Sequence, residues 1–452
     1  MRSFLAGEFR TILKHGGSIL AGQLAAVAFG VTDTLVAGHY SDQALAALSV
    51  GSSIFITVNV TLMGIVQALM PLYAELHGGQ RHAAVGRAVR QGVYLCLLCA
   101  LVGVLFMMAP APFLQMAKVP AALEGVVKSY LSILAISFLP AILFRLYGTL
   151  NQSLGRPLMV TWLQLGALGI KVPLSIWLVG GGAGVPPLGA VGCAWATFIV
   201  NYGLLAVAIA TLRLSKVYRP YRIWAAFEAP DWTLLRTFAR LGIPGGLAYM
   251  VDVSAFALMA LFIARLGTQA TAAHQIAASS AALLYMTPLS IALACSSRVS
   301  YWIGASMRDK ARQVIGLALC ITGGIALLLC GLVVTFNHQI AAVFTPNAVV
   351  ASVAAGLLLW VALYHLADAT QALCSFLLRC YRVTFLPLLA YAVFLWGLGL
   401  YGGYRLAYEG LPGLAPLQSA QAFWICTALG MALVASSLGG LLWWVIRADK
   451  RA

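Results

Sequence analysis

The chain has 452 residues, of which 62% are hydrophobic and 9% are charged. Soluble domains carry roughly 25% charged residues, so this composition excludes an ordinary soluble protein and indicates a polytopic membrane protein. The net charge of +16 does not by itself indicate nucleic-acid binding, because membrane proteins gather Lys and Arg in their cytoplasmic loops. We expect no nucleic-acid partner.

Apolar runs separated by polar segments predict an all-α fold of twelve transmembrane helices. Crossing a hydrocarbon core of about 30 Å takes about 20 apolar residues. The predicted spans lie at 14–37, 44–74, 91–109, 126–150, 158–180, 188–212, 236–264, 270–303, 313–335, 348–378, 383–406 and 419–446.

Basic residues are distributed unevenly between the loops on the two sides. When alternate loops are assigned to opposite sides, 22 of the 28 basic residues fall on the side of the amino terminus. Only Lys118, Lys128, Arg265 and Arg405 fall on the other side, and Arg145 and Lys171 lie within spans. Because cytoplasmic loops carry the excess of Lys and Arg, both termini are predicted to be cytoplasmic. A miscount by one helix would destroy this asymmetry.

A weak internal repeat appears when the sequence is shifted by half its length. Gln43 then falls on Gln269, Gly78 on Gly304 and Arg156 on Arg382. Six spans per half predict two lobes, 1–212 and 236–452, related by an axis along the membrane normal. The basic segment 213–235 between them, with Trp224 and Trp232, is predicted to lie along the inner interface. The repeat favours a transporter, although pores and receptors can also be duplicated.

Three acidic residues, Asp33, Asp252 and Asp368, lie well inside predicted spans. A charged side chain at the centre of a span costs roughly 2.5–3.5 kcal/mol, so each is by default a functional site facing the protein interior or a wet cavity. The alternative for Asp252 is a structural acid that is hydrogen-bonded to a neighbouring helix. An acid that takes up and releases a cation as its access to water changes can drive antiport.

Two further polar residues stand near these acids. Tyr364 lies one helical turn before Asp368, where its phenol can hydrogen-bond the carboxylate or share a bound cation. The alternative is a hydroxyl that only satisfies a buried acid. Lys171 is a lone intramembrane ammonium, and its nearest plausible partner is Asp33; the alternative is that Lys171 snorkels to the interface. Gln275 and Ser279 are secondary candidates, and His274 is expected to cap or pack.

The chain lacks the common motifs of ATP use and hydrolysis. No Walker A sequence, Gly-x-Ser-x-Gly or HExxH pattern is present. We therefore expect no enzymatic activity and no cofactor beyond a coupling ion.

Several segments together resemble the multidrug and toxic compound extrusion (MATE) family, in its bacterial NorM-type branch. The resemblance covers almost the whole chain and depends on the order and spacing of its pieces. They are VTDTLVAGHYSDQALAALSVGSSI (31–54), LGRPLM (154–159), LGAVGCAWAT (188–197), LGIPGGLAYMVDVSAF (241–256), LGTQATAAHQIA (266–277), MTPLSIALACSSRVSYWIGA (286–305) and YHLADATQALCSFLLRCYR (364–382).

The resemblance implies two six-helix lobes arranged in a V around a central cleft, in a bacterial inner membrane. It implies export of cationic or amphipathic small molecules in exchange for Na⁺ or H⁺. The family's carboxyl-lobe cation site falls on Tyr364, Asp252 and Asp368, where Na⁺ could bind the two acids. Its amino-lobe acid falls on Asp33. We expect a monomer in contact with membrane lipids.

The chain departs from the family pattern at two places. Asp252 stands where relatives usually carry Glu, which shortens the reach of the carboxylate. Lys171-Val-Pro-Leu-Ser175 stands where relatives read Asn-x-Pro-Leu-Asn, and by resemblance this segment lies near Asp33 and Thr197. Lys171 could then replace a bound cation, so we predict that the amino lobe does not bind Na⁺.

These observations predict a multidrug efflux antiporter. The alternative is a flippase for lipid-linked precursors on a related two-lobed fold. A flippase would require a cationic cavity, and the three intramembrane acids argue against a cationic cavity in this chain.

Overall fold

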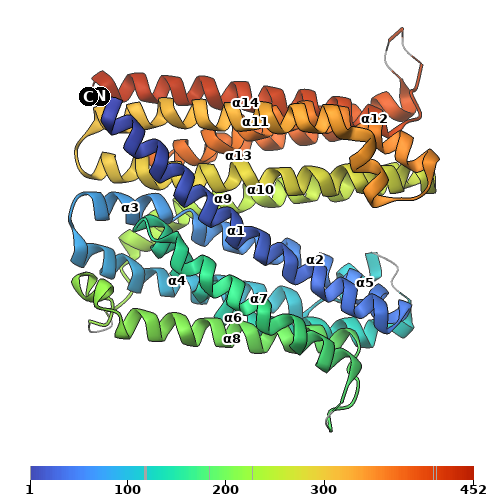
Figure 1. The fold of residues 1–452 in the computed structure, drawn as a ribbon, viewed down its shortest axis with the longest axis horizontal. Helices are drawn as coiled ribbons and strands as arrows, with labels where there is room; N and C mark the ends of the chain where they lie inside the picture. The colour runs from blue at the N-terminus through green and yellow to red at the C-terminus, as the bar shows by residue number, and fades with distance from the viewer. Residues whose placement is uncertain are drawn as a thin grey trace. The chain divides into compact units, whose positions relative to one another are not determined.

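The computed structural model describes residues 2–116, 120–182, 184–225, 228–410, 412–413 and 415–451. Lys118, one of the basic residues assigned to the outer side, lies outside the described residues. The described chain is mainly helical (Figure 1). Its elements are α1 (Arg2–Tyr40), α2 (Asp42–Gln67), α3 (Met70–Gly78), α4 (His82–Met108), α5 (Ala111–Met116), α6 (Ala121–Ser153), α7 (Pro157–Gly180), α8 (Ala190–Leu214), η1 (Lys216–Tyr221), α9 (Trp232–Ile263), η2 (Ala264–Leu266), α10 (Thr268–Gly304), α11 (Arg308–Phe344), α12 (Ala348–Cys380), α13 (Phe385–Ala390), η3 (Tyr391–Gly402), η4 (Arg405–Glu409) and α14 (Ala420–Arg451).

The prediction of twelve spans is confirmed. Within the described residues, twelve helical segments are long and apolar enough to cross a membrane. Several extend beyond the predicted spans, and the first begins at Arg2 rather than at residue 14. Hydropathy marks only the apolar part of a helix, whereas the backbone hydrogen bonds of the same helix continue into its polar ends.

Two spans differ from simple α-helices. The span 42–78 is interrupted between α2 and α3, and Pro71 lies in the first turn of the second piece. The span 385–409 is mostly π-helix, in η3 and η4. A π-helix of this length is rare, and π-helical turns occur frequently at functional sites.

The chain folds into two compact units. The amino-terminal unit contains Ser18–Gly246. The carboxyl-terminal unit contains Leu247–Ala452 together with Met1–Gly17. Helix α1 is therefore divided between the units. The predicted lobes, 1–212 and 236–452, remain a prediction about which parts act together.

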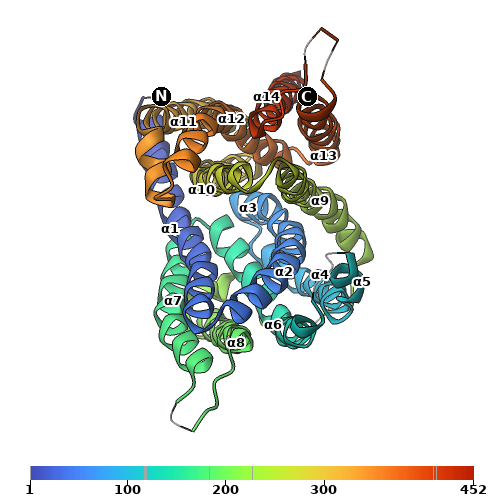
Figure 2. The same cartoon turned by 90° about the vertical axis from the view of Figure 1, so that its right-hand side faces the viewer.

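Each unit has its own closely packed helices. In the first, α6 packs against α2, α4 and α8, and α7 packs against α8. In the second, α12 packs against α10, α11 and α14, which run alongside it in Figures 1 and 2. The start of α1 and the end of α14 lie at the same end of the second unit, as an even number of spans requires (Figure 1).

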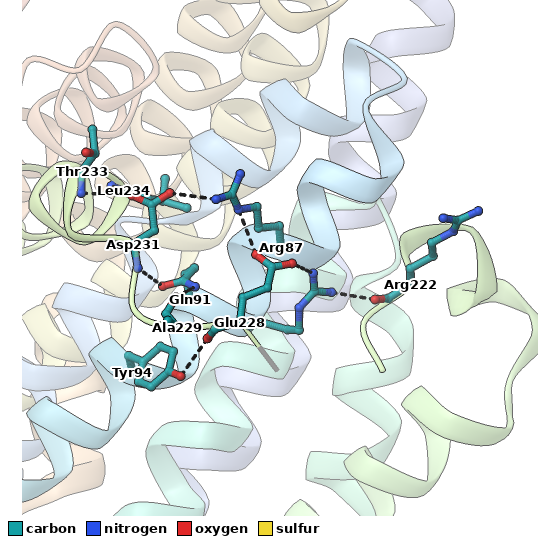
Figure 3. Close-up of polar contacts among 10 residues, drawn as sticks. Arg87, Gln91, Tyr94, Arg222, Glu228, Ala229, Asp231, Thr233 and Leu234 are labelled. Carbon is teal, nitrogen blue, oxygen red and sulfur yellow. Dashed lines mark hydrogen bonds and ion pairs between the residues drawn. The ribbon is translucent and has the colours of Figure 1, made fainter. Parts of the chain in front are cut away.

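The linker after α8 is anchored to the beginning of α4. Glu228 accepts from Arg87 and Arg90, with N–O distances of 3.0 and 2.5 Å, and Asp231 pairs with Arg87 at 3.2 Å (Figure 3). Gln91 donates to the carbonyl of Ala229 and accepts from the amide of Asp231, both at 2.9 Å. Arg87 and Arg90 belong to the excess of basic residues that predicts the orientation in the membrane. They also form specific ion pairs with the linker.

Candidate functional site

The amino-terminal unit brings Asp33, Lys171, Ser175 and Thr197 together. The Lys171 Nζ lies 2.8 Å from Asp33 Oδ1 and 2.8 Å from Thr197 Oγ1. The Ser175 hydroxyl donates to the same Asp33 oxygen at 3.4 Å. The two Asp33 contacts come from one face of α7, because residues 171 and 175 are one helical turn apart.

The burial of Lys171 excludes the snorkelling alternative. Lys171 is 0% exposed, and its ammonium lies 5.9 Å from the centroid of the Phe29 ring. A buried charge is tolerated when it is paired and hydrogen-bonded, and Asp33 and Thr197 supply both kinds of partner. The ammonium therefore already neutralises the carboxylate that the family resemblance assigns to the amino lobe.

The carboxyl-terminal unit brings Asp252 and Asp368 together. Asp252 lies in α9 and Asp368 in α12, close enough for their charges to interact. Asp368 is 3% exposed and accepts a hydrogen bond of 2.8 Å from the side chain of Gln371. The other end of the Gln371 amide accepts from the Tyr391 hydroxyl, at the beginning of η3. Oδ1 of Asp252 is buried and has no hydrogen-bond partner among the described residues.

A cavity adjoins Asp252. Its lining comes from α9, α10, α12 and η3, and includes Asp252, Tyr285, Ser375, Arg379 and Tyr391. Tyr285 and Tyr391 both interact electrostatically with Asp252 and with Asp368. Carboxylate and phenol oxygens are donors of the kind that a hard cation prefers.

Tyr364 contacts aromatic rings rather than supplying the hydrogen bond to Asp368. It is 3% exposed, and its ring centroid lies 5.9 Å from that of Phe256 and 6.1 Å from that of Trp424, both in edge-on geometry. The side chain that donates to Asp368 is Gln371. Tyr364 is still near enough to interact electrostatically with both acids.

The secondary candidates do not line the cavity. Gln275 is exposed and Ser279 is half-buried, both on α10. His274, expected to cap or pack, is 1% exposed and lies 5.9 Å from the Trp424 ring, centroid to centroid. Within the described parts of the chain, no group of three or more His, Cys, Asp and Glu side chains could hold a metal ion.

Three residues of this site were not anticipated from the sequence. Gln371 lies three residues after Asp368, on the same helical face, so helical spacing could have found it. Tyr391 and Arg379 carry no such signal, because their contact with the cavity depends on how the helices pack.

Acids inside the spans of both units of a helical membrane protein are typical of ion-dependent transporters, in which intramembrane carboxylates mark ion pathways. Comparison with known proteins specifies the family. The MatE family profile matches residues 19–177 and 244–404. The chain is a member of the MatE family.

Curated relatives align over nearly the full length. "Probable multidrug resistance protein NorM" of Aromatoleum aromaticum is 35% identical over 436 residues, covering 96% of this chain and 94% of the relative. "Multidrug resistance protein PmpM" of Pseudomonas aeruginosa is 31% identical over 403 residues, covering 89% of this chain and 84% of the relative.

Solved structures share the fold. The Vibrio cholerae MATE transporter VcmN in the bent form has a TM-score of 0.86 at 15% identity, with 99% of each chain covered. The eukaryotic MATE transporter AtDTX14 has a TM-score of 0.86 at 17% identity, with 99% of each chain covered. The predicted family membership and helical fold are confirmed.

Proposed function

We propose that this chain is a secondary active efflux antiporter of a bacterial inner membrane, with both termini in the cytoplasm. It exports amphipathic, mostly cationic drugs in exchange for Na⁺ or H⁺. Family membership and the names of the NorM and PmpM relatives support multidrug efflux and do not favour the flippase alternative. The excess of basic residues on the side of both termini supports the orientation.

The observation that carries the coupling mechanism is that Asp252 lines a cavity and interacts electrostatically with the buried Asp368. Two neighbouring carboxylates repel each other when both are charged. Binding of a proton or a metal cation to the pair is therefore favoured. Drug expulsion can be linked to the ion because the acids are neutral when occupied and charged when empty. Gln371 and Tyr391 hold Asp368 in position, and Tyr364 packs edge-on against Trp424.

The amino-terminal unit plays a different part in this proposal. Lys171 already occupies the place beside Asp33 where a cation would bind. We therefore assign ion coupling to the carboxyl-terminal unit. Asp33, Lys171, Ser175 and Thr197 form a separate proton- or substrate-linked site.

Efflux of a cationic fluorescent dye from proteoliposomes tests the function. An imposed Na⁺ or H⁺ gradient should drive dye movement by the wild type, and the gradient that works identifies the ion. Asp252→Asn and Asp368→Asn should each abolish gradient-driven movement while leaving thermal melting near that of the wild type. Retention of ion-driven efflux by both variants would refute the mechanism.

A further inference from the structure

A buried arginine lines the same cavity as Asp252. Arg379 lies at the end of α12 and is 6% exposed. Its Nη1 is buried without a hydrogen-bond partner, and among the described residues the arginine forms no ion pair. An arginine remains charged at any physiological pH, so this is a buried positive charge without a carboxylate partner.

Two aromatic rings hold the guanidinium in its present position. The Cζ of Arg379 lies 4.4 Å from the centroid of the Phe376 ring and 5.8 Å from that of Tyr249. A cation over an aromatic face is held more weakly than one in a buried ion pair with a carboxylate. The arginine is therefore retained there by a contact that a nearby free carboxylate can replace.

The opposite charge is on the same cavity. Asp252 lines it as well, and its buried Oδ1 also lacks a partner within the described chain. Buried charges in proteins are normally paired, so two opposite and incompletely satisfied charges beside one cavity require an explanation. A guanidinium that pairs with Asp252 at another stage of the transport cycle would satisfy both charges.

We propose that Arg379 is the internal counter-charge of Asp252, moving from the Phe376 ring to Asp252 when the driving cation leaves. This inference rests on the proposed antiport function. The guanidinium competes with the cation for the carboxylate and thereby promotes release of the cation. It also neutralises the empty site, so the transporter can change conformation without an unpaired buried acid.

The half-saturating concentration of the driving cation in the dye-efflux assay measures this competition. Arg379→Gln removes the competitor and should lower that concentration about tenfold, with a slower maximal rate because release is impaired. Arg379→Lys keeps the positive charge and should stay closer to the wild type.

A second variant should shift the same quantity in the opposite direction. Phe376→Leu removes the aromatic face and keeps an apolar side chain in a buried position, so the guanidinium would occupy the cavity more often. The half-saturating concentration should rise about threefold. In the double variant Phe376→Leu/Arg379→Gln this rise should disappear, because the effect of Phe376 acts through Arg379. General destabilisation would not produce two shifts of opposite sign.

Arg447→Gln is the matched control, because Arg447 is exposed on α14 and lies outside the cavity. It should behave as the wild type.

An unchanged half-saturating concentration in Arg379→Gln, or a shift of Phe376→Leu in the same direction as Arg379→Gln, would overturn the inference while leaving antiport intact. If Arg379→Gln fails to fold, Phe376→Leu alone tests the inference. A rise in its half-saturating concentration supports the inference, and a fall overturns it. Absence of gradient-driven efflux in the wild type would instead refute the proposed function, and this inference with it.

Discussion

At the scale of single residues, the two units deal with a buried acid in different ways. Asp33 has a tethered ammonium at 2.8 Å, whereas Asp252 interacts electrostatically with Asp368 and lines a cavity. The same residue type therefore has different chemistry in the two units. A permanently paired acid has little affinity for a free cation, and an acid near another acid has a high one.

Replacing Lys171 should create a cation requirement that the wild type lacks at this site. In Lys171→Gln, Asp33 loses its ammonium and remains buried, so thermal stability in detergent should fall by the equivalent of about 3–5 kcal/mol. Added Na⁺ should restore part of the loss, because the free carboxylate can then bind it. Thermal melting with and without Na⁺ measures both effects.

Lys128→Gln is a suitable control, because Lys128 forms an exposed pair with Glu124 on α6. Its melting temperature should hardly change. The double variant Asp33→Asn/Lys171→Gln should recover stability without Na⁺. A wild type that is itself stabilised by Na⁺ at Asp33 would contradict the assignment of ion coupling to the other unit.

At the scale of elements, the acids Asp33 and Asp252 lie on helices that bury little of their surface within the protein. Neither α1 nor α9 is among the closely packed helix pairs, and their most apolar windows are only 22% buried, against 50–56% for α6, α10 and α12. Much of the surface of α1 and α9 therefore faces outward, where lipid contacts a membrane-spanning helix.

The first turns of α1 are fixed to the carboxyl-terminal unit by one acid. Glu8 is 5% exposed and accepts from Arg298 at 2.8 and 2.5 Å and from the Trp302 indole at 3.1 Å. Glu8→Gln should weaken this attachment and increase amide hydrogen exchange over residues 2–17 by about tenfold or more. Exchange in α12 should not change. Equal exchange in the variant and the wild type would show that the attachment depends on other contacts.

The linker should detach from α4 when its central acid is neutralised. Glu228 pairs with Arg87 and with the buried Arg90, so Glu228→Gln leaves Arg90 with a weaker partner. We expect a loss of about 1–3 kcal/mol and faster proteolysis within 213–235. Gly86→Ala should act in the same direction, because a Cβ at residue 86 would lie 1.8 Å from the carbonyl oxygen of Tyr221. Limited proteolysis of membranes measures both, and Glu124→Gln, in an exposed pair, is the control.

At the scale of the whole molecule, the distribution of charge predicts the orientation in the membrane. A cysteine introduced at Lys216 should react with a membrane-impermeant maleimide only after permeabilisation, whereas one at Leu417 should react in intact cells. Both side chains are exposed. The native cysteines must first be replaced, since Cys320 is exposed. The reverse labelling pattern would invert the proposed topology.

The sequence by itself determined the class of fold, the number of spans and the three intramembrane acids. It could do so because each of these depends on a local quantity: hydropathy over about 20 residues, or the cost of one charge in an apolar run. The spacing of residues 171 and 175 likewise puts two side chains on one face of a helix, whatever that helix packs against.

The tertiary structure decided which groups meet. Lys171 and Asp33 are far apart in the chain, and snorkelling is excluded only because their helices pack with the ammonium inward. Only the packing of α9, α10, α12 and η3 placed Arg379 and Asp252 on one cavity and gave Asp368 the Gln371–Tyr391 pair in place of Tyr364. Hydropathy and helical spacing describe one helix at a time, whereas partners on different helices are set by the packing of side chains between helices, which neither pattern encodes.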